Sequence, residues 1–218
     1  PATGDFNADG IADDAVFRPA NGRWGWRNPS GPSITAYYGI SGDQPVPADY
    51  DGNFRSDTAV WRPANGGWYI QGITRFNYGL TGDIPVPADY DGDGADDASL
   101  YRHFTGPANG AGGAWYVRHL TRVFYGQPGD LPVPGDYSGD GTVEFSVFRP
   151  SYGRWYVAGS PYVEFGQAGD LPVALDYDGD STTDRALYRP SYGRWYIYGV
   201  TQVNFGGAGD LPVGGQAD

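Results

Sequence analysis

The sequence of 218 residues has no cysteine, no lysine and only two histidines. Without cysteine, no disulfide can cross-link the fold and no thiolate can act as a nucleophile. The lack of lysine and a formal net charge of −12 argue against nucleic acid as a partner, because proteins contact phosphates mainly through clustered basic residues. No apolar run reaches the roughly 18 residues of a membrane-spanning helix. We therefore expect stabilisation by packing, ring closure or metal, with no nucleic-acid partner and no membrane span.

Groups suited to catalysis are also scarce. The two histidines, His103 and His119, belong to no recognisable Ser/His/Asp set, zinc site or phosphate loop. Glycoside hydrolysis would need a pair of acid and base carboxylates. Outside the acidic positions that repeat along the chain, four acidic residues remain: Asp14, Asp96, Glu164 and Asp218. Glu164 falls where the repeats vary, so we expect it to be exposed, and we predict that the protein is not an enzyme.

What the sequence does contain is typical of an all-β domain. Aromatic residues make up 16% of the chain, and 36 glycines and 18 prolines supply many turns. This composition is too aromatic for a disordered chain and too rich in turn residues for a helical one. The chain begins at Pro1 with no initiator methionine and no signal-like segment, so we expect a mature form or an excised domain. We expect residues 1–218 to form a single domain.

One unit recurs five times along the chain, and each copy begins with an acidic run. In the fifth copy the run spans 176–184 and is followed by Ala-Leu-Tyr-Arg-Pro, then Gly-Arg-Trp-Tyr-Ile, then Gly-Asp-Leu-Pro-Val. The runs start at Asp5, Asp49, Asp89, Asp136 and Asp176, at spacings of 40 to 47 residues. Most of the extra length in the third unit lies in the Gly/Ala-rich stretch 105–114, which we interpret as a loop insertion.

Each unit contains four short segments with strand composition. Residues 85–90, 186–189, 195–197 and 203–206 are examples, bounded by Gly, Pro, Asn and Asp. Four strands in about 42 residues is the size of a propeller blade. The sequence therefore predicts an all-β, five-bladed β-propeller with four antiparallel strands per blade. Residues 209–213 repeat the segment that precedes the acidic run in the other units, and residues 1–5 lead directly into the first acidic run. We therefore expect the two ends of the chain to lie in one blade and close the ring.

The acidic run of each unit has oxygen-bearing side chains at positions 1, 3, 5 and 9. Position 7 has no common side chain, as expected if it offers only its backbone carbonyl. With position 7 included, the runs contribute Asp5, Asn7, Asp9, Ile11 and Asp13; Asp49, Asp51, Asn53, Arg55 and Asp57; Asp89, Asp91, Asp93, Ala95 and Asp97; Asp136, Ser138, Asp140, Thr142 and Glu144; and Asp176, Asp178, Asp180, Thr182 and Asp184. A solvated turn would explain one such run but not five in the same register.

These oxygen atoms predict a calcium site in every unit. Ca²⁺ takes six to eight oxygen ligands at about 2.3–2.6 Å, and short acidic side chains on alternate residues can converge on one point. The run begins like an EF-hand loop but lacks the glutamate at position 12, so position 9 has to close the site. Mg²⁺ fits less well because it retains its waters. Seventeen of the 26 acidic residues lie at positions 1, 3, 5 and 9 of these runs, and five Ca²⁺ ions would change the net charge from −12 to about −2.

The motif Pro-Val-Pro-Ala-Asp-Tyr-Asp-Gly-Asp-Gly at 85–94, with a strand and then Arg-Pro and Gly-x-Trp-Tyr after such loops, resembles the FG-GAP/VCBS class of calcium-binding propeller repeats. That class includes integrin α-chain propellers, which have seven longer blades, and many secreted bacterial proteins. The resemblance covers essentially the whole chain. It implies about five calcium ions, one between the first and second strands of each blade, a secreted or periplasmic location, and a role in adhesion or ligand binding. Related propellers include lectins, so it favours carbohydrate or another cell-surface ligand as the partner.

Three further residue types recur in every unit, and we interpret them as structural. A tryptophan begins the third strand, an arginine follows an aromatic residue in the second strand, and an aspartate lies in the Gly-Asp-x-Pro-Val turn. We expect the tryptophans to form the core between blades, and the arginines and aspartates to pair or to cap turns. The sets are Trp24, Trp68, Trp115, Trp155 and Trp195; Arg18, Arg62, Arg102, Arg149 and Arg189; and Asp43, Asp83, Asp130, Asp170 and Asp210.

The turn before the third strand varies between units, which makes it the better candidate for a ligand site. The candidates are Asn21, Arg23, Tyr152, Arg154, Tyr192 and Arg194. Tyrosine beside arginine suits a sugar or an acidic ligand, although a plain polar turn is the alternative. Alternating strand direction would place these turns opposite the calcium loops. Two functions stay open for this monomer or domain: a lectin-like binding or adhesion module, and a structural spacer of a larger secreted protein with no ligand other than Ca²⁺.

Overall fold

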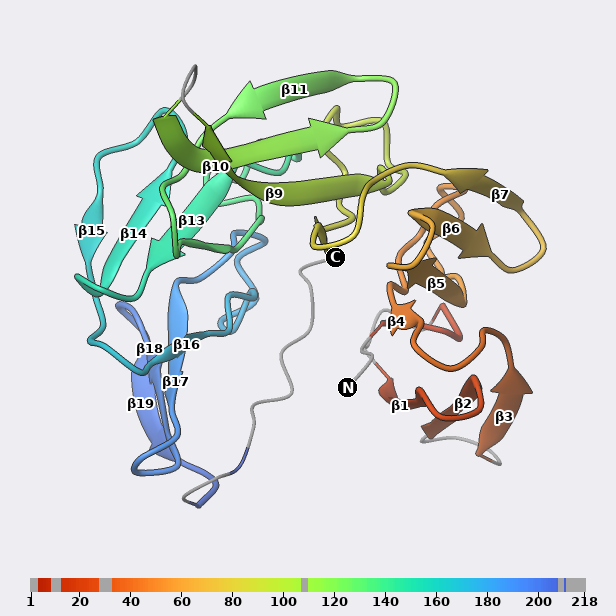
Figure 1. Ribbon diagram of the computed structural model, residues 1–218. Coiled ribbons are helices and arrows are strands. Elements are labelled where there is room, and N and C mark those ends of the chain that lie inside the picture. The colour runs from red at the N-terminus through yellow and green to blue at the C-terminus, as the bar shows by residue number, and fades with distance from the viewer. Residues whose placement is uncertain (1–3, 9–12, 28–32, 107–109, 208–209, 211–218) are drawn as a thin grey trace. The chain divides into compact units, whose positions relative to one another are not determined.

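Antiparallel β-sheets make up the regular secondary structure of the computed structural model, which describes residues 4–8, 13–27, 33–106, 110–207 and 210. Among these residues there is no helix. Four sheets have four strands and one has three, with the strands of each sheet paired in chain order (Figure 1). These are the blades of a five-bladed β-propeller, so the predicted all-β fold class is confirmed.

The strands follow the repeat closely. The first sheet contains β1 (Asp14–Arg18), β2 (Arg23–Arg27) and β3 (Ile34–Tyr37), and the second contains β4 (Gln44–Pro45), β5 (Ala59–Arg62), β6 (Gly67–Ile70) and β7 (Thr74–Asn77). The third contains β8 (Ile84–Pro85), β9 (Ser99–Gly106), β10 (Gly110–Val117) and β11 (Thr121–Phe124). The fourth contains β12 (Leu131–Pro132), β13 (Ser146–Arg149), β14 (Arg154–Val157) and β15 (Val163–Glu164), and the fifth contains β16 (Leu171–Pro172), β17 (Ala186–Arg189), β18 (Arg194–Ile197) and β19 (Thr201–Asn204).

The chain groups into two compact units. One holds the first two sheets and part of the third, and the other holds the fourth and fifth sheets with the rest of the third. The segment 209–213, expected to complete the first sheet, lies outside the described residues except for Asp210, so closure of the ring stays a prediction. Among the described residues, no helix is long and apolar enough to cross a membrane.

The first strand of each four-stranded sheet is shorter than the sequence pattern suggested. The expected strand 85–90 is reduced to β8, Ile84–Pro85, followed by one isolated bridge between Ala88 and Asp97. Pro85 and Pro87 have no N–H to donate. Of residues 85–87, only Val86 therefore donates a hydrogen bond to the neighbouring strand, to the Ser99 carbonyl at 3.0 Å. Proline therefore limits the ladder and leaves the acidic loop closed by a single bridge.

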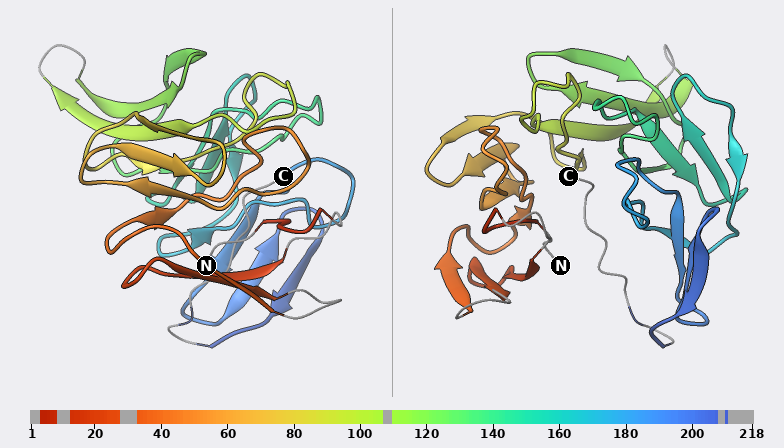
Figure 2. Two further views of the ribbon diagram at one scale, coloured as in Figure 1. Left: turned by 90° about the vertical axis from the view of Figure 1, so that its right-hand side faces the viewer. Right: turned by 180° about the vertical axis from the view of Figure 1, so that it is seen from behind.

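The extra length of the third sheet forms strand, and the expectation of a loop insertion over 105–114 was wrong. β9 and β10 are eight residues each and continue the hairpin into this stretch, leaving only 107–109 outside the described residues. Figure 2 shows this yellow-green hairpin extending as two long arrows. Small glycine and alanine side chains do not obstruct pairing, and Phe104 packs edge-on against Phe124 of β11 with ring centroids 5.7 Å apart. The insertion thus lengthens an existing hairpin and adds no new element.

The recurring tryptophans lie in the core, as predicted. Trp24, Trp68 and Trp115 are 0% exposed and Trp155 is 1% exposed, whereas Trp195 is partly buried. In every sheet the indole N–H donates to a backbone carbonyl ten or fourteen residues later, at 2.9–3.1 Å. An aliphatic residue of the next sheet joins the cluster around three of these rings: Val60, Leu100 or Leu187. Within each unit the tryptophans therefore form the core between neighbouring blades.

The recurring arginines and aspartates form ion pairs in four sheets, which confirms their structural interpretation. Each pair joins two side chains 19 residues apart with Nε–Oδ1 distances of 2.5–2.7 Å: Arg62 with Asp43, Arg102 with Asp83, Arg149 with Asp130, and Arg189 with Asp170. The aspartate side chains are 0–1% exposed. Each aspartate, Asp210 included, also accepts a backbone N–H three residues earlier and so caps its own turn.

Candidate functional site

The acidic loop of each unit is closed by one backbone bridge. The residue before position 1 pairs with position 9 in all five loops, as in the Ala48–Asp57 and Leu175–Asp184 bridges. The position-9 amide donates to that partner's carbonyl at 2.8–3.0 Å. In the four-stranded sheets the loop joins the first strand to the second. The fold therefore holds positions 1 and 9 next to each other.

Position 1 organises the loop through its carboxylate. Asp49 accepts N–H groups from Gly52 at 2.8 Å, Asn53 at 3.1 Å and Phe54 at 2.6 Å. The position-1 aspartates of the third, fourth and fifth loops accept the corresponding amides of positions 4 and 6. The loop backbone thus wraps around an aspartate, which satisfies amides that would otherwise lack a partner.

Three carboxylates converge in four of the five loops, with one oxygen of each within 4.8 Å of the others. The groups are Asp49, Asp51 and Asp57; Asp89, Asp91 and Asp97; Asp136, Asp140 and Glu144; and Asp176, Asp178 and Asp184. These are positions 1, 3 and 9, except in the fourth loop, where Ser138 occupies position 3 and position 5 supplies the third carboxylate. Oxygen donors this close to one another suit a hard cation such as Ca²⁺.

The first loop brings together the same positions with one amide in place of a carboxylate. Asn7 donates from Nδ2 to Asp13 Oδ1 at 3.1 Å, and its backbone N–H donates to Asp5 Oδ1 at 3.2 Å. Asp5 and Asp13 are both buried. The other predicted ligands of this loop, Asp9 and Ile11, lie outside the described residues.

Position 9 is the most constrained of the carboxylates. In every loop it accepts the backbone N–H of position 2, at 2.7–3.1 Å. Burial raises the pKa of Asp57 to about 6, and repulsion by Asp51 and Asp49 adds to the shift, while the hydrogen bond from Tyr50 opposes it. Burial and the neighbouring carboxylates likewise raise the pKa of Asp97 to about 6. A bound cation would relieve this repulsion, so the residues fit a metal ion.

Positions 5 and 7 do not converge as uniformly as the sequence pattern suggested. Asp93 lies outside its carboxylate group and accepts the Ala95 N–H at 2.9 Å. Asp180 is also outside its group and accepts both the N–H and the hydroxyl of Thr182. Asp140 of the fourth loop accepts the same bonds from Thr142 and still belongs to its group, so these bonds do not by themselves keep position 5 out of the group. The use of position 5 in these loops, and of the position-7 carbonyls, stays a prediction.

The loop turns use left-handed backbone at position 4, and also at position 6 in the four loops where that residue is described. At position 6, Gly94 and Gly141 have φ values of 89° and 86°. Phe54 and Ser181 occupy position 6 in the other two of these loops with φ values of 64° and 68°. Position 4 is left-handed in all five loops, including the non-glycine Ala8 with φ 62°.

A tyrosine at position 2 supports four of the loops, buried in the third loop and half-buried in the others, and sequence reasoning missed it. The hydroxyl donates to a valine carbonyl four residues earlier at 2.7–2.9 Å, in Tyr50, Tyr90, Tyr137 and Tyr177. Burial raises the pKa of each of these hydroxyls, to about 12 for Tyr177. The signal was available, because an aspartate followed by an aromatic residue opens all five runs.

Neighbouring loops are joined by backbone hydrogen bonds within each compact unit. The position-8 amide of one loop donates to the position-1 carbonyl of the preceding loop: Ser56 to Asp5 at 2.7 Å, Asp96 to Asp49 at 2.6 Å, and Thr183 to Asp136 at 2.7 Å. Arg55, at position 7, directs its side chain to the Phe6 carbonyl of the preceding loop. Within each compact unit, neighbouring candidate metal sites are therefore tied together through position 1 of the earlier loop.

The candidate ligand residues lie at the end of each sheet opposite its acidic loop, as predicted. Tyr152 and Tyr192 are 65% and 69% exposed. Arg154 pairs with Glu164 and lies 5.3 Å from the Tyr152 ring centroid. Glu164 is exposed, as expected from its variable position.

The other ligand candidates make contacts within their own sheets. Arg194 donates to Asn204 at 2.6 Å. In the first sheet, Asn21 is exposed and accepts the backbone N–H of Arg23 at 3.2 Å, and Arg23 reaches the Thr35 hydroxyl at 3.4 Å. These arginines are thus held by neighbouring strands of their own sheets.

Comparisons of the chain with protein-family models, with characterised proteins and with solved structures find no match. The functional assignment therefore rests on the geometry of the chain itself. Its strongest element is the repeated convergence of carboxylates in the acidic loops.

Proposed function

We propose that the protein is a calcium-stabilised, non-enzymatic β-propeller that works outside the cell or in the periplasm as a binding or adhesion module, with carbohydrate as its ligand class. The observation that carries the calcium part is the grouping of three carboxylates within 4.8 Å in four separate loops. The same positions recur in the first loop, where Asn7 replaces one carboxylate.

The chemistry of the donors favours Ca²⁺ over other cations. All the converging side-chain atoms are oxygens, which suits a hard ion, and the chain has no cysteine to hold a soft one. The loops are exposed on one side and built from short side chains, which can supply the irregular, oxygen-rich coordination that Ca²⁺ accepts. The residues at positions 1, 3 and 9 would hold the ion, with position 5 in place of position 3 in the fourth loop.

The chain's own residues prepare these sites. The position-1 aspartate accepts hydrogen bonds from the loop amides, and the position-2 amide donates a hydrogen bond to the position-9 carboxylate. Without a cation, three carboxylates repel one another at a closed loop. An ion that binds only the folded loop stabilises the fold by about 2.7 kcal/mol for each independent site at 100 times its Kd.

Exposed tyrosine and arginine side chains at the opposite turns support the binding part of the proposal. Tyr152 and Tyr192 present large amphipathic rings to solvent. The resemblance of the repeats to the FG-GAP/VCBS class, which includes secreted bacterial proteins and lectin-like relatives, supports the location and the ligand class. A module of this kind needs no catalytic groups.

A purely structural role is the second candidate, and one observation favours it. Arg154 and Arg194 are engaged by Glu164 and Asn204 within their own sheets. A spacer or accessory domain of a larger secreted protein would use these contacts only for rigidity, and Ca²⁺ would be its only ligand.

Binding of the calcium-loaded protein to a glycan array tests the two candidates against each other. A binding module retains defined glycans at micromolar protein concentration. A structural spacer retains none while still carrying about five calcium ions, counted by native mass spectrometry. A protein that carries no calcium after dialysis against millimolar Ca²⁺ would overturn the proposal at its base.

A further inference from the structure

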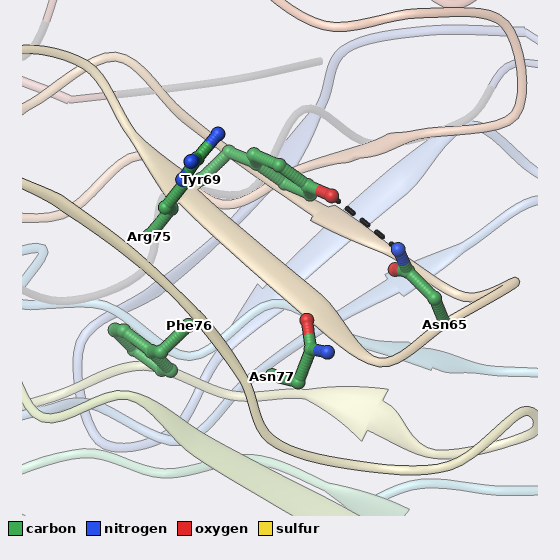
Figure 3. A pocket seen from close by; sticks show the side chains of 5 residues that line it. All are labelled: Asn65, Tyr69, Arg75, Phe76 and Asn77. Atoms are coloured by element: carbon green, nitrogen blue, oxygen red, sulfur yellow. Dashed lines mark hydrogen bonds between the residues drawn. The ribbon is translucent and has the colours of Figure 1, made fainter.

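The second sheet contains a pocket that the repeat pattern did not predict. It has a volume of about 370 Å³ and is lined by Asn65, Tyr69, Arg75, Phe76 and Asn77 (Figure 3). Asn65 comes from the turn before β6, Tyr69 from β6, and the other three from β7. The turn is the one already assigned to ligand binding in other sheets, at the end opposite the acidic loop.

Two of the lining side chains occupy the space that a side chain at Gly67 would need. A Cβ at Gly67 would lie 2.6 Å from Asn65 Oδ1 and 2.7 Å from a ring carbon of Tyr69. In strand register Gly67 faces Asn77, and the equivalent residues of the first, fourth and fifth sheets are Arg23, Arg154 and Arg194. The second sheet therefore has a glycine where those three sheets carry an arginine.

Two of the lining side chains are fixed before any ligand arrives. Asn65 accepts the Gly67 N–H at 2.9 Å and donates to the Tyr69 hydroxyl at 3.3 Å. The Arg62 guanidinium lies 4.3 Å from the centroid of the Tyr69 ring and is itself held by the buried Asp43. Because these side chains are already ordered, less side-chain conformational entropy is lost when a ligand binds.

Phe76, which lines the pocket from the opposite face of β7 to Arg75 and Asn77, is equally fixed. The Phe76 ring is stacked on the buried Trp68, with centroids 6.2 Å apart and planes at 18°. The Arg118 guanidinium lies 3.8 Å from the Phe76 centroid. Phe76 therefore cannot swing into the opening without breaking these contacts.

Arg75 supplies a positive charge at the edge of the pocket. In Figure 3 it lies beside the Tyr69 ring. No carboxylate pairs with Arg75 within the part of the chain that the structure describes, whereas Arg154 pairs with Glu164 in the fourth sheet. The pocket thus offers a guanidinium fork, two amides and a phenol hydroxyl around one opening.

We propose that this pocket binds a saccharide unit that carries a carboxylate, in which Arg75 pairs with the carboxylate and Asn65, Asn77 and Tyr69 hydrogen-bond to sugar hydroxyls. A guanidinium pairs with a carboxylate in two parallel hydrogen bonds, and amides both donate to and accept from hydroxyls. The proposal rests on the binding function proposed above and assigns it a site and a ligand class.

A glycan array with matched sets tests this assignment in the presence of calcium. The sets carry a terminal glucuronate, a terminal sialate, or the neutral parent glycan, so the array separates the two sources of carboxylate. We expect at least one acidic set to bind about tenfold more tightly than its neutral parent. Equal binding of acidic and neutral glycans, or a preference for the neutral parents, would overturn the proposal.

Three variants locate the binding. Arg75→Gln removes the guanidinium, and we expect it to weaken acidic-glycan binding about tenfold and to abolish the preference over the neutral parent. Gly67→Arg fills the pocket with the residue found in three other sheets, and we expect it to remove binding. Arg122→Gln is the matched control, because Arg122 occupies the corresponding place in the third sheet, where it lies over Phe124. Each variant is first shown to keep the melting temperature of the wild type in calcium.

The outcomes separate this proposal from the broader one. If the wild type binds glycans and Arg75→Gln and Gly67→Arg bind them equally well, the pocket is not the site, while the binding function stands. If the calcium-loaded wild type binds no glycan, both carbohydrate assignments fail and the structural role remains.

Discussion

Single residues decide whether an acidic loop can hold a cation. At position 9 the carboxylate accepts the N–H of position 2 and also belongs to the group of converging oxygens. In the second loop, burial and two neighbouring carboxylates raise the pKa of Asp57. The same residue therefore destabilises the metal-free loop and stabilises the loaded one.

Substitution of Asp57 by Asn is expected to have opposite consequences with and without metal. The amide oxygen can still accept the Tyr50 N–H, but one charge is lost. With calcium at 100 times Kd, loss of this site lowers the free energy of unfolding by about 2.7 kcal/mol. In excess chelator the variant is no less stable than the wild type, because repulsion in the loop is reduced.

Thermal unfolding of Asp57→Asn in calcium and in EDTA measures this difference. Glu164→Gln is the control, since it removes an exposed carboxylate outside the loops. Equal destabilisation of Asp57→Asn under both conditions would mean that Asp57 acts only as a structural cap.

Phe54 occupies a backbone conformation that glycine adopts without strain. Its φ is 64° and its side chain is 82% exposed, so little burial is lost on truncation. We expect Phe54→Gly to raise the free energy of unfolding by up to about 1 kcal/mol in urea titrations. Phe205→Gly is the control: Phe205 is 76% exposed without positive φ, and the change there should destabilise. A loss of stability in both variants would contradict the assignment of strain to Phe54.

The repeated Arg–Asp pairs hold a strand and a turn of each sheet together more strongly than a surface ion pair does. Arg62 binds Asp43 through two hydrogen bonds of 2.7 and 2.9 Å, and the Asp43 side chain is 0% exposed. The pair links the second strand of a sheet to the turn that precedes its first strand. The Arg154–Glu164 pair, by contrast, is largely open to solvent.

Arg62→Met should therefore be far more costly than Arg154→Met. The first leaves Asp43 as a buried charge without its partner, and we expect a loss of about 3 kcal/mol in the free energy of unfolding. The second should change stability little, because exposed pairs are screened by solvent. Chemical denaturation of both variants checks the contrast. Similar losses in the two variants would show that burial does not set the strength of these pairs.

The repeat allowed most of the elements to be predicted, for physical reasons that particular residues show. The tryptophans were predicted to be core because a large apolar side chain at one place in every unit has to be buried. The second and third strands were predicted because β-branched and aromatic residues lie between turn signals. The hairpin extension over 105–114 was missed because glycine and alanine carry no alternation that marks a strand.

The candidate site was predictable at positions 1 and 9 and less so between them. Spacing alone indicates which oxygens can converge, and it succeeded for Asp49 and Asp57. It does not reveal which position-5 carboxylates join the group, since Asp140 lies within its group and Asp93 lies outside its own. Nor does it reveal the pocket in the second sheet, which depends on how Gly67 lies against Tyr69.

For the molecule as a whole, the acidic loops carry most of the acidic residues and also hydrogen-bond to one another. Positions 1, 3, 5 and 9 of these loops hold seventeen of the 26 acidic residues of a chain with net charge −12. The backbone bonds from Ser56 to Asp5, from Asp96 to Asp49 and from Thr183 to Asp136 tie neighbouring loops together within each compact unit. Binding at one loop should therefore help to order the next.

The most direct test is thermal unfolding of the intact chain in millimolar Ca²⁺, in millimolar Mg²⁺ and in excess EDTA, with bound metal counted by native mass spectrometry. We expect about five calcium ions per chain, a melting temperature more than about 10 °C lower in EDTA, and little recovery with Mg²⁺. An unchanged melting temperature with no bound metal would contradict it and leave the acidic loops as ordinary turns.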